Sequence, residues 1–206
     1  FVKLFRDMQY TVENNPYHQE GNVFIHTMMV LEHASENWND PEINFAALLH
    51  DINKPDCYKQ YGSGHGHDKA GVPQIEEFCK QWKVPNNYRD IAKIVCEQHQ
   101  RIHTVMGRDQ NNWSRPKSIM SIFEQSGAER KVERFLKVLK ACESDSKGRI
   151  GLSAKDDYLQ RPYLEDCLYA VTSLDKKSIS RKLLENGKSG EIIGLEIRAA
   201  KIAAIS

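Results

Sequence analysis

The sequence predicts an all-α fold. Apolar residues recur at three- and four-residue steps along most of the chain, which is the period of an amphipathic helix. No stretch alternates apolar and polar residues for long enough to indicate a sheet, and no internal repeat is visible. Proline, glycine and asparagine interrupt the helical pattern at intervals, as expected for connections between helices. We therefore expect a bundle of helices.

In the first half of the chain, single residues indicate where helices start and stop. Asp40 suits an N-cap, and Pro41 suits the first position of the helix that it opens. Residues 55–66 contain Gly, Ser and Pro without a helical period and are expected to form a loop. The helices expected in this half cover residues 21–37, 42–53, 67–82 and 87–103.

The second half alternates helical and irregular stretches. Residues 104–115 and 145–158 lack a period and are expected to be irregular. Between them, Phe135 and Leu139 belong to the apolar face of a longer helix. The helices expected here are a short one from Pro116 and others at residues 128–143, 159–174, 178–186 and 191–205.

Bulk composition favours a cytoplasmic protein. The net charge of +1 gives no sign of a nucleic-acid or membrane partner. The five cysteines are scattered without CxxC spacing, as in reduced cytosolic proteins. No apolar run approaches the ~18 residues of a membrane span, and no signal peptide is visible. The chain starts at Phe1, which is compatible both with a fragment of a longer protein and with an independent product.

The adjacent pair His50 and Asp51 is the sharpest chemical signal. It ends a strongly apolar helix, where two ionisable side chains are costly unless a partner satisfies them. A divalent metal such as Mn, Fe, Co, Ni or Zn would do so, because imidazole nitrogen and carboxylate oxygen both suit these ions. A helix end capped by histidine is the simpler alternative, and the dipeptide alone does not exclude it.

Two residues from other helices fit the same centre. His26 lies in the preceding helix, and a helix hairpin would bring it against His50. A core histidine bonded to a backbone carbonyl is the alternative, and His33 on the same face competes with it. Asp145 follows the helix expected at residues 128–143, a position that also suits a surface acid.

Further histidines and basic residues are candidates for the same centre. The histidines would hold a second metal or contact a substrate phosphate, and the basic residues would neutralise that phosphate. Each also has an ordinary interpretation, as a helix-end histidine or a solvated cation. The preferred phosphate contact is Lys54, three residues after Asp51. The full set is His67, His99, His103, Lys54, Lys69 and Arg149.

The order of these residues resembles that of a known family. His26, the His50–Asp51 pair and Asp145 match the H…HD…D signature of the HD superfamily. More narrowly, separated segments of residues 20–206 are similar to the C-terminal HD domain of bacterial CCA-adding enzymes. The segments are IHTMMVLEHA, FAALLHDINK, GHGHDKAG, VPNNYRDIAKIV, EQHQRIHT, ESDSKGRIG and GLEIRAAKIAAI.

The resemblance implies a fold and a site. Residues 1–206 would form one HD phosphohydrolase domain, with residues 1–20 as a lead-in and residues 159–206 as a helical extension. The metal would lie between helices, with Asp51 and Lys54 contributing to catalysis. Its ligands would be His26, His50, Asp51 and Asp145.

The resemblance also implies an activity. The HD domain of these enzymes is described as hydrolysing 2′,3′-cyclic phosphodiesters and 2′-nucleotides, with some general phosphatase activity. The expected cofactor is a divalent metal, with Ni, Mn, Co, Mg and Fe as candidates. The expected partners are a nucleotide or an RNA end, with tRNA as a candidate and no membrane. HD domains of this kind can also form homodimers.

Two features depart from the family pattern. The family usually has Gly before the lysine of its HD-x-G-K stretch, whereas Asn53 precedes Lys54 here. Asparagine tolerates left-handed backbone angles, so we expect the turn to survive. The chain also lacks a Gly-Ser followed by a paired-aspartate strand, which CCA addition needs to hold magnesium. We therefore expect this chain not to add CCA by itself.

Two other functions compete with the preferred one. A different HD activity, such as hydrolysis of nucleoside 5′-monophosphates, would use the same ligands. A non-catalytic module that binds tRNA or mediates dimerisation would need only a vestigial metal site. A cluster of cations gives the second alternative some support, although part of it is also the polar face of one helix. The cluster is Arg130, Lys131, Arg134, Lys137 and Lys140.

Overall fold

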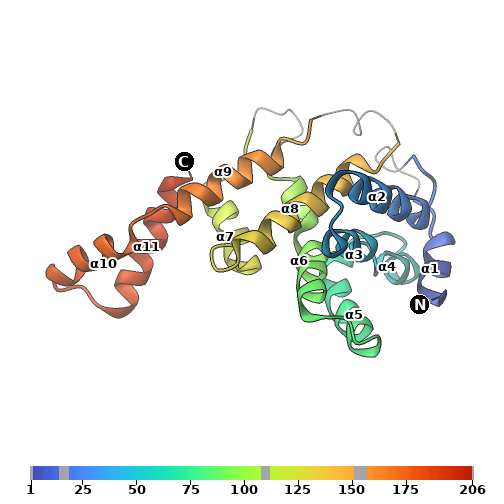
Figure 1. The fold of residues 1–206 in the computed structure, drawn as a ribbon, viewed down its shortest axis with the longest axis horizontal. Coiled ribbons are helices and arrows are strands. Elements are labelled where there is room, and N and C mark those ends of the chain that lie inside the picture. Colours follow the sequence, from blue (N-terminus) through green and yellow to red (C-terminus); the bar gives the residue numbers. More distant parts are fainter. Residues whose placement is uncertain (1, 14–18, 108–111, 151–156, 206) are drawn as a thin grey trace.

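The computed structural model describes residues 2–13, 19–107, 112–150 and 157–205, and these residues form helices joined by short connections (Figure 1). The all-α prediction is confirmed, since the described residues contain two isolated β-bridges and no strand. The helices are α1 (Val2–Gln9), α2 (Val23–Trp38), α3 (Pro41–Leu49), α4 (Lys54–Tyr61), α5 (His67–Gln81), α6 (Asn86–His103), α7 (Pro116–Ser126), α8 (Val132–Lys147), α9 (Gln160–Thr172), α10 (Lys176–Glu185) and α11 (Gly190–Ala204).

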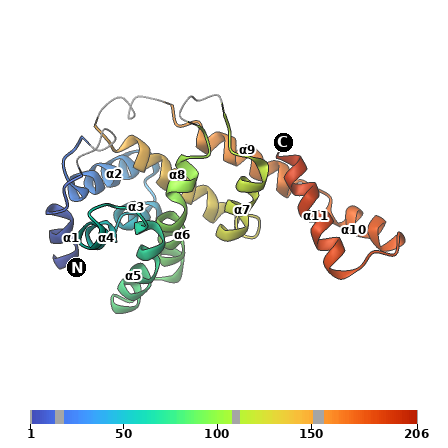
Figure 2. The ribbon, with the colours of Figure 1, turned by 180° about the vertical axis from the view of Figure 1, so that it is seen from behind.

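The core lies where α2, α3, α6 and α8 pack together. Helix α6 lies between α5 and α8 when the molecule is viewed from either side (Figure 1, Figure 2). Buried apolar side chains fill the space between these helices, among them Leu49, Val95, Phe135 and Leu139. This burial stabilises the helices that carry the candidate site residues.

Helices α2 and α3 form the hairpin that the sequence predicts. Asn22 caps α2, because its side chain accepts a hydrogen bond of 2.9 Å from the backbone N–H of Ile25. Asp40 caps α3 in the same way, accepting from the N–H of Glu42 at 2.9 Å. Asn39 joins the two helices with a left-handed φ of 46°. The link is therefore short and holds the two helices side by side.

Helices α2 and α8 approach each other closely at Gly148, which directly follows α8. A Cβ atom added to Gly148 would lie 2.5 Å from the Cα and 2.6 Å from the N of Val30. Such distances are too short for any side chain, so the backbones of the two segments are in contact there.

Several expected boundaries are wrong. Residues 55–66 are not all loop, because residues 54–61 form α4; Pro55 lies in its first turn and Gly62 ends it with a φ of 69°. Gly and Pro therefore mark the ends of a short helix rather than a loop. Helix α3 ends at Leu49 instead of residue 53. The lead-in at residues 1–20 contains α1, and helix α8 runs to residue 147.

The C-terminal hairpin, which we define as α10 and α11, extends away from the body at the end opposite to α1 (Figure 1). All of its residues are described, and none of its side chains is buried. Ion pairs join it to the body, including Lys201 to Glu129 at 2.8 Å and Arg198 to Glu124 at 2.7 Å. Among the described residues, no helix is long and apolar enough to span a bilayer.

Candidate metal centre

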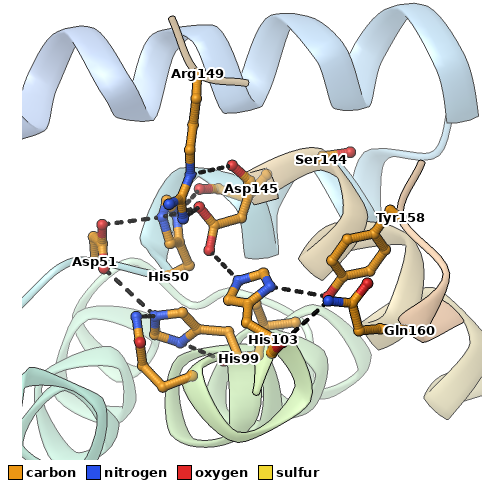
Figure 3. Close-up of polar contacts among 12 residues, drawn as sticks. His50, Asp51, His99, His103, Ser144, Asp145, Arg149, Tyr158 and Gln160 are labelled. Atoms are coloured by element: carbon orange, nitrogen blue, oxygen red, sulfur yellow. Dashed lines mark hydrogen bonds and ion pairs between the residues drawn. The ribbon is translucent and has the colours of Figure 1, made fainter. Parts of the chain in front are cut away.

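Histidine and aspartate side chains from five helical segments converge in the core. Figure 3 shows His50, Asp51, His99 and Asp145 among them. The pair His50 and Asp51 directly follows α3, and Asp145 lies in the last turn of α8 rather than beyond it. All but His67 expose at most 1% of their surface, and His67 exposes 6%. The set is His26 from α2, His50, Asp51, His67 from α5, His99 from α6 and Asp145.

A first group of ligand atoms comprises His26, His50 and Asp145. Their potential ligand atoms all lie within 4.8 Å of one another. The Oδ1 of Asp145 is 3.0 Å from the Nε2 of His26 and 3.7 Å from the Nε2 of His50. The Oδ2 of Asp51 is 3.1 Å from the Nε2 of His50 and 3.8 Å from that of His26. The structure thus brings together the four residues that the resemblance implies as ligands.

A second group comprises Asp51, His67 and His99, again with ligand atoms within 4.8 Å of one another. The Oδ1 of Asp51 is 3.0 Å from the Nε2 of His67 and 3.7 Å from the Nε2 of His99. The two imidazole Nε2 atoms are 3.2 Å apart. Asp51 therefore faces the first group with one oxygen and the second group with the other.

Backbone carbonyls fix how three of these histidines present their nitrogens. The Nδ1 of His50 is 2.7 Å from the O of Ala47, that of His67 is 2.6 Å from the O of Gly64, and that of His99 is 2.9 Å from the O of Cys96. A carbonyl oxygen only accepts hydrogen bonds, so each Nδ1 carries the proton in a neutral ring. In a neutral ring, Nε2 then directs a lone pair into the centre.

The donor set fits a cation. Lone pairs of imidazoles and carboxylate oxygens repel one another unless a positive charge lies between them. The buried Nε2 of His50 and Oδ1 of Asp51 have no hydrogen bond of good geometry to any described residue. Metal-ligating histidines commonly donate their other N–H to a backbone carbonyl or carboxylate, as these do. The arrangement can therefore hold a divalent metal.

The pKa values of the buried groups depend on burial and on the opposite charges that lie next to each group. Burial opposes ionisation of His50, yet the carboxylates of Asp51 and Asp145 raise its pKa to about 9. His99 lies further from those charges, and burial lowers its pKa to about 3. Burial also opposes ionisation of Asp145, but Arg149 and His50 hold its pKa well below the ordinary value.

Asp145 is held by a chain of polar contacts (Figure 3). The Nε2 of His103 lies 2.7 Å from its Oδ2, and the hydroxyl of Tyr158 lies 2.9 Å from the Nδ1 of His103. With Nε2–H donating to the carboxylate, Nδ1 accepts from the tyrosine O–H. The Nη2 of Arg149 donates to Oδ1 of Asp145 at 2.8 Å. Two of the predicted auxiliary residues, His103 and Arg149, thus contact a candidate ligand directly.

Of the other two basic residues, Lys54 contacts the candidate ligand Asp51, whereas Lys69 makes no such contact. The Nζ of Lys54 is buried, 2.8 Å from the Oδ2 of Asp51 and 3.0 Å from the Oε1 of Glu13. Burial disfavours its charge, but the two carboxylates hold its pKa above the ordinary value. The side chain of Lys69 is exposed and makes no hydrogen bond or ion pair with another described residue.

Two details of the sequence analysis need correction. Asn53 has φ −97° and ψ −3°, so the turn before Lys54 needs no left-handed residue and the tolerance of asparagine for that region is not used. Its amide instead donates to the Oε1 of Gln74 at 2.9 Å. His33 does not compete with His26, because its Nδ1 lies 3.1 Å from the Oγ of Ser144 and outside both groups of ligand atoms.

Sequence reasoning missed three residues around the centre. Glu13 contacts Lys54, Glu20 places its Oε1 3.0 Å from the Nδ1 of His26, and Tyr158 bonds to His103. None of the three lies within a helix, so the helical period gives no signal for them. The one available clue was the position of Glu20, an acid that lies shortly before the helix of His26.

Comparison with known proteins gives a consistent result. A model of the HD domain family matches residues 23–146. The multifunctional CCA protein of Shewanella denitrificans is 35% identical over 190 residues, which is 92% of this chain and 43% of that protein. The multifunctional CCA protein of Burkholderia cenocepacia is 34% identical over 191 residues, which is 92% of this chain and 44% of that protein. The chain thus spans less than half the length of these curated relatives. No solved structure matches it.

Proposed function

This chain belongs to the HD domain family of metal-dependent phosphohydrolases, and on that premise we propose that it hydrolyses 2′,3′-cyclic phosphodiesters and 2′-nucleotides with a divalent metal. We also propose that residues 1–206 act as one domain, with residues 159–206 as its helical extension. A nucleotide or an RNA end would be the substrate. The names of the CCA relatives support tRNA as its source.

One observation carries the proposal: buried imidazoles whose Nδ1 atoms are engaged by carbonyls direct their Nε2 atoms at two buried carboxylates. A purely structural core would replace such a set by apolar residues, since unpaired buried charges are costly. Ligand sets of N and O atoms suit Mn, Fe, Co or Ni, and carboxylates also accept Mg.

We assign the first ion to His26, His50, Asp51 and Asp145. His67 and His99 would hold a second ion, with Asp51 shared between the two. A bound divalent cation supplies Lewis acidity, since it lowers the pKa of water and withdraws charge from a phosphoryl oxygen. The number of ions is thus a property that metal analysis of the purified protein measures directly.

The surrounding residues would position the reactants. Arg149 exposes 14% of its side chain, against 5% for Lys54, and is therefore the better phosphate contact of the two. Lys54 would instead neutralise and orient Asp51. Asp51 would also orient the attacking water, and His103 would hold Asp145 in place. Guanidinium groups suit phosphate because they donate two parallel hydrogen bonds.

The test combines metal content with a substrate panel. Cyclic, 2′-, 3′- and 5′-nucleotides are offered with Ni, Mn, Co or Mg to the protein after chelation. We expect metal-dependent hydrolysis that is fastest for 2′,3′-cyclic and 2′-substrates, and none in Asp51→Ala. Asp166→Ala, which removes an exposed acid from α9, is the matched control. Equal activity of metal-saturated Asp51→Ala and the wild type would contradict the proposed site.

The same panel decides between the alternatives. A preference for 5′-nucleotides would favour a different HD activity. A non-catalytic RNA-binding module would bind tRNA in a salt-dependent manner and hydrolyse no nucleotide. The cation cluster supports that module less than its sequence suggests, because Lys137 pairs with Asp40 at 2.8 Å and Arg134 pairs with Asp90 at 3.8 Å. Cations already paired with carboxylates are less available to phosphates.

A further inference from the structure

Two buried carboxylates reach the metal centre from a segment that precedes the range matched by the HD family. Glu13 exposes 5% of its surface and Glu20 exposes 6%. We call residues 2–13 and 19–22 the N-terminal clasp. Burying a carboxylate is costly unless a partner compensates its charge. We therefore expect each of these two acids to contact a specific polar or charged group.

The clasp is fixed by backbone pairing. The N–H of Glu13 donates to the O of Gly21 at 3.3 Å, and the N–H of Val23 donates to the O of Thr11 at 3.0 Å. Val12 and Asn22 form an antiparallel bridge. These contacts lock Glu13 and Glu20 on to the first turn of α2, which carries His26.

Helix α1 anchors the clasp to the body. The ring of Phe5 meets that of Phe24 edge to face, with centroids 6.3 Å apart. Asp7 accepts a hydrogen bond of 2.9 Å from the Nζ of Lys59 on α4. The clasp is therefore attached to α2, which carries His26, and to α4, which begins with Lys54.

Glu20 contacts the Nδ1 of His26, which is the ring nitrogen that faces away from the centre. Its Oε1 lies 3.0 Å from the Nδ1, while the Nε2 of the same ring lies 3.0 Å from Asp145 inside the centre. A carboxylate this close to the outer nitrogen favours a proton there and makes the inner nitrogen a better donor to a metal. His26 has this carboxylate where His50, His67 and His99 have a carbonyl oxygen.

Glu13 acts on Asp51 through Lys54. Its two oxygens lie 3.0 and 3.1 Å from the Nζ of Lys54, which lies 2.8 Å from the Oδ2 of Asp51. Without Glu13, the ammonium would direct its whole charge at Asp51. It would then compete for the oxygen that a metal needs and would repel the metal.

We propose that the N-terminal clasp is part of the metal centre, with Glu20 and Glu13 as positioning residues that set the metal affinity through His26 and Asp51. The inference rests on the proposed function, because it presupposes that the centre binds a metal. It adds that residues 23–146 do not contain every group that the site needs.

The first experiment titrates Mn²⁺ calorimetrically into the chelator-treated wild type, Glu20→Ala and Glu20→Gln. Substitutions of groups that orient a metal-ligating histidine typically cost about 10- to 100-fold in metal affinity. We expect a loss in this range for Glu20→Ala and a smaller loss for Glu20→Gln, because an amide oxygen keeps a partial negative charge next to the Nδ1 of His26. In a His26→Ala background, Glu20→Ala should lower the affinity no further, since Glu20 acts through His26.

The second experiment tests Glu13 and controls for the loss of a buried ion pair. Glu13→Ala should weaken Mn²⁺ binding at least about fivefold, in keeping with the costs known for groups around metal ligands. Glu129→Gln is the matched control, because Glu129 likewise forms ion pairs with lysine, at 3.0 and 2.8 Å, but lies outside both groups of ligand atoms. It should bind Mn²⁺ as the wild type does.

The outcomes separate the two proposals. If the wild type binds no divalent metal, the proposed function itself is wrong. If the wild type binds Mn²⁺ and the Glu20 and Glu13 variants bind it equally well, the clasp is only structural and the inference is overturned. Should Glu20→Ala fail to fold, the Mn²⁺ affinity of Glu20→Gln is compared with that of the wild type. An unchanged affinity would again overturn the inference.

Discussion

The metal centre and the C-terminal hairpin both depend on ion pairs, but they bury them to different depths. At the centre, the paired side chains of His26, Asp145 and Asp51 expose at most 2% of their surface. In the most exposed of the pairs that join the hairpin to the body, Arg198 and Glu124 expose 41% and 40%. Charges in a dry core interact strongly and are costly to leave unpaired, whereas exposed pairs are screened by water. Removing a charge from an ion pair of similar length should therefore cost more at the centre than at the hairpin.

The largest expected effect is at Asp145. Asp145→Asn keeps the shape of the side chain but removes a charge that faces three imidazoles and Arg149. We expect metal-dependent hydrolysis to fall below detection while the helical circular dichroism is retained. Ser144→Ala changes the neighbouring residue, whose hydroxyl accepts from Trp38 and lies outside the ligand groups, and should remain active. A fully active Asp145→Asn would remove Asp145 from the ligand set.

The next largest effect is the loss of stability when a core side chain is truncated, compared with truncation in the hairpin. Phe135→Ala removes a ring that exposes 1% of its surface and packs on Phe123 with centroids 5.5 Å apart. We expect a loss of about 3–5 kcal/mol in the free energy of unfolding, measured by urea denaturation. Leu195→Ala in α11 removes a side chain that is 60% exposed, and should change that free energy by less than about 0.5 kcal/mol. Comparable losses would mean that the hairpin is a structural part of the core.

A smaller effect is expected from the contact behind His103. Tyr158→Phe removes one hydroxyl, which lies 2.9 Å from the Nδ1 of His103, and leaves the buried ring. His103 would lose part of its orientation towards Asp145, so we expect roughly a tenfold loss in metal affinity or in hydrolysis. Tyr169→Phe is the control, since Tyr169 is 74% exposed. Equal behaviour of the two variants would show that His103 is positioned without the tyrosine.

The smallest effect is a pH dependence of the hairpin. Burial raises the pKa of Glu129, but hydrogen bonds from Lys201 and Lys176 outweigh burial and lower it below the ordinary value of 4.5. The stabilisation is thus fully present above about pH 4.5 and is lost as the pH falls through the lower pKa of the folded state. We expect the protection of the α11 amides against exchange, measured relative to their intrinsic rate at each pH, to fall below that pH by an amount worth up to about 1 kcal/mol.

Glu129→Gln isolates this titration from that of other carboxylates. In the variant, the α11 amides should already be less protected than in the wild type at neutral pH. Their protection should then change less on acidification. Identical pH profiles in the variant and the wild type would assign the effect to other groups.

The sequence predicts the parts of the molecule whose signals are local. The apolar period indicates the helices, and Asp40 with Pro41 marks a helix start that the structure confirms. Helix α4 escapes detection because it has only eight residues, too few for its period to stand out. The convergence of His50, Asp51 and Asp145 follows the family pattern in the sequence.

The rest depends on contacts between distant segments. Lys54 lies three residues after Asp51, but its direction is decided by Glu13, 41 positions before it in the chain. Glu20 and Tyr158 belong to irregular segments, where neither period nor spacing assigns a side chain to a face. Such residues become visible only when the tertiary structure places them beside a ligand.

Gly148 has a consequence for the size of the centre. It touches the backbone of Val30, one helical turn beyond His26, and follows Asp145 by three residues. The spacing between the two segments that supply these ligands is therefore set by peptide atoms, which do not change rotamer. A methyl group at this one position, which contributes no ligand atom itself, would wedge the segments apart and widen the opening that a cation has to fill.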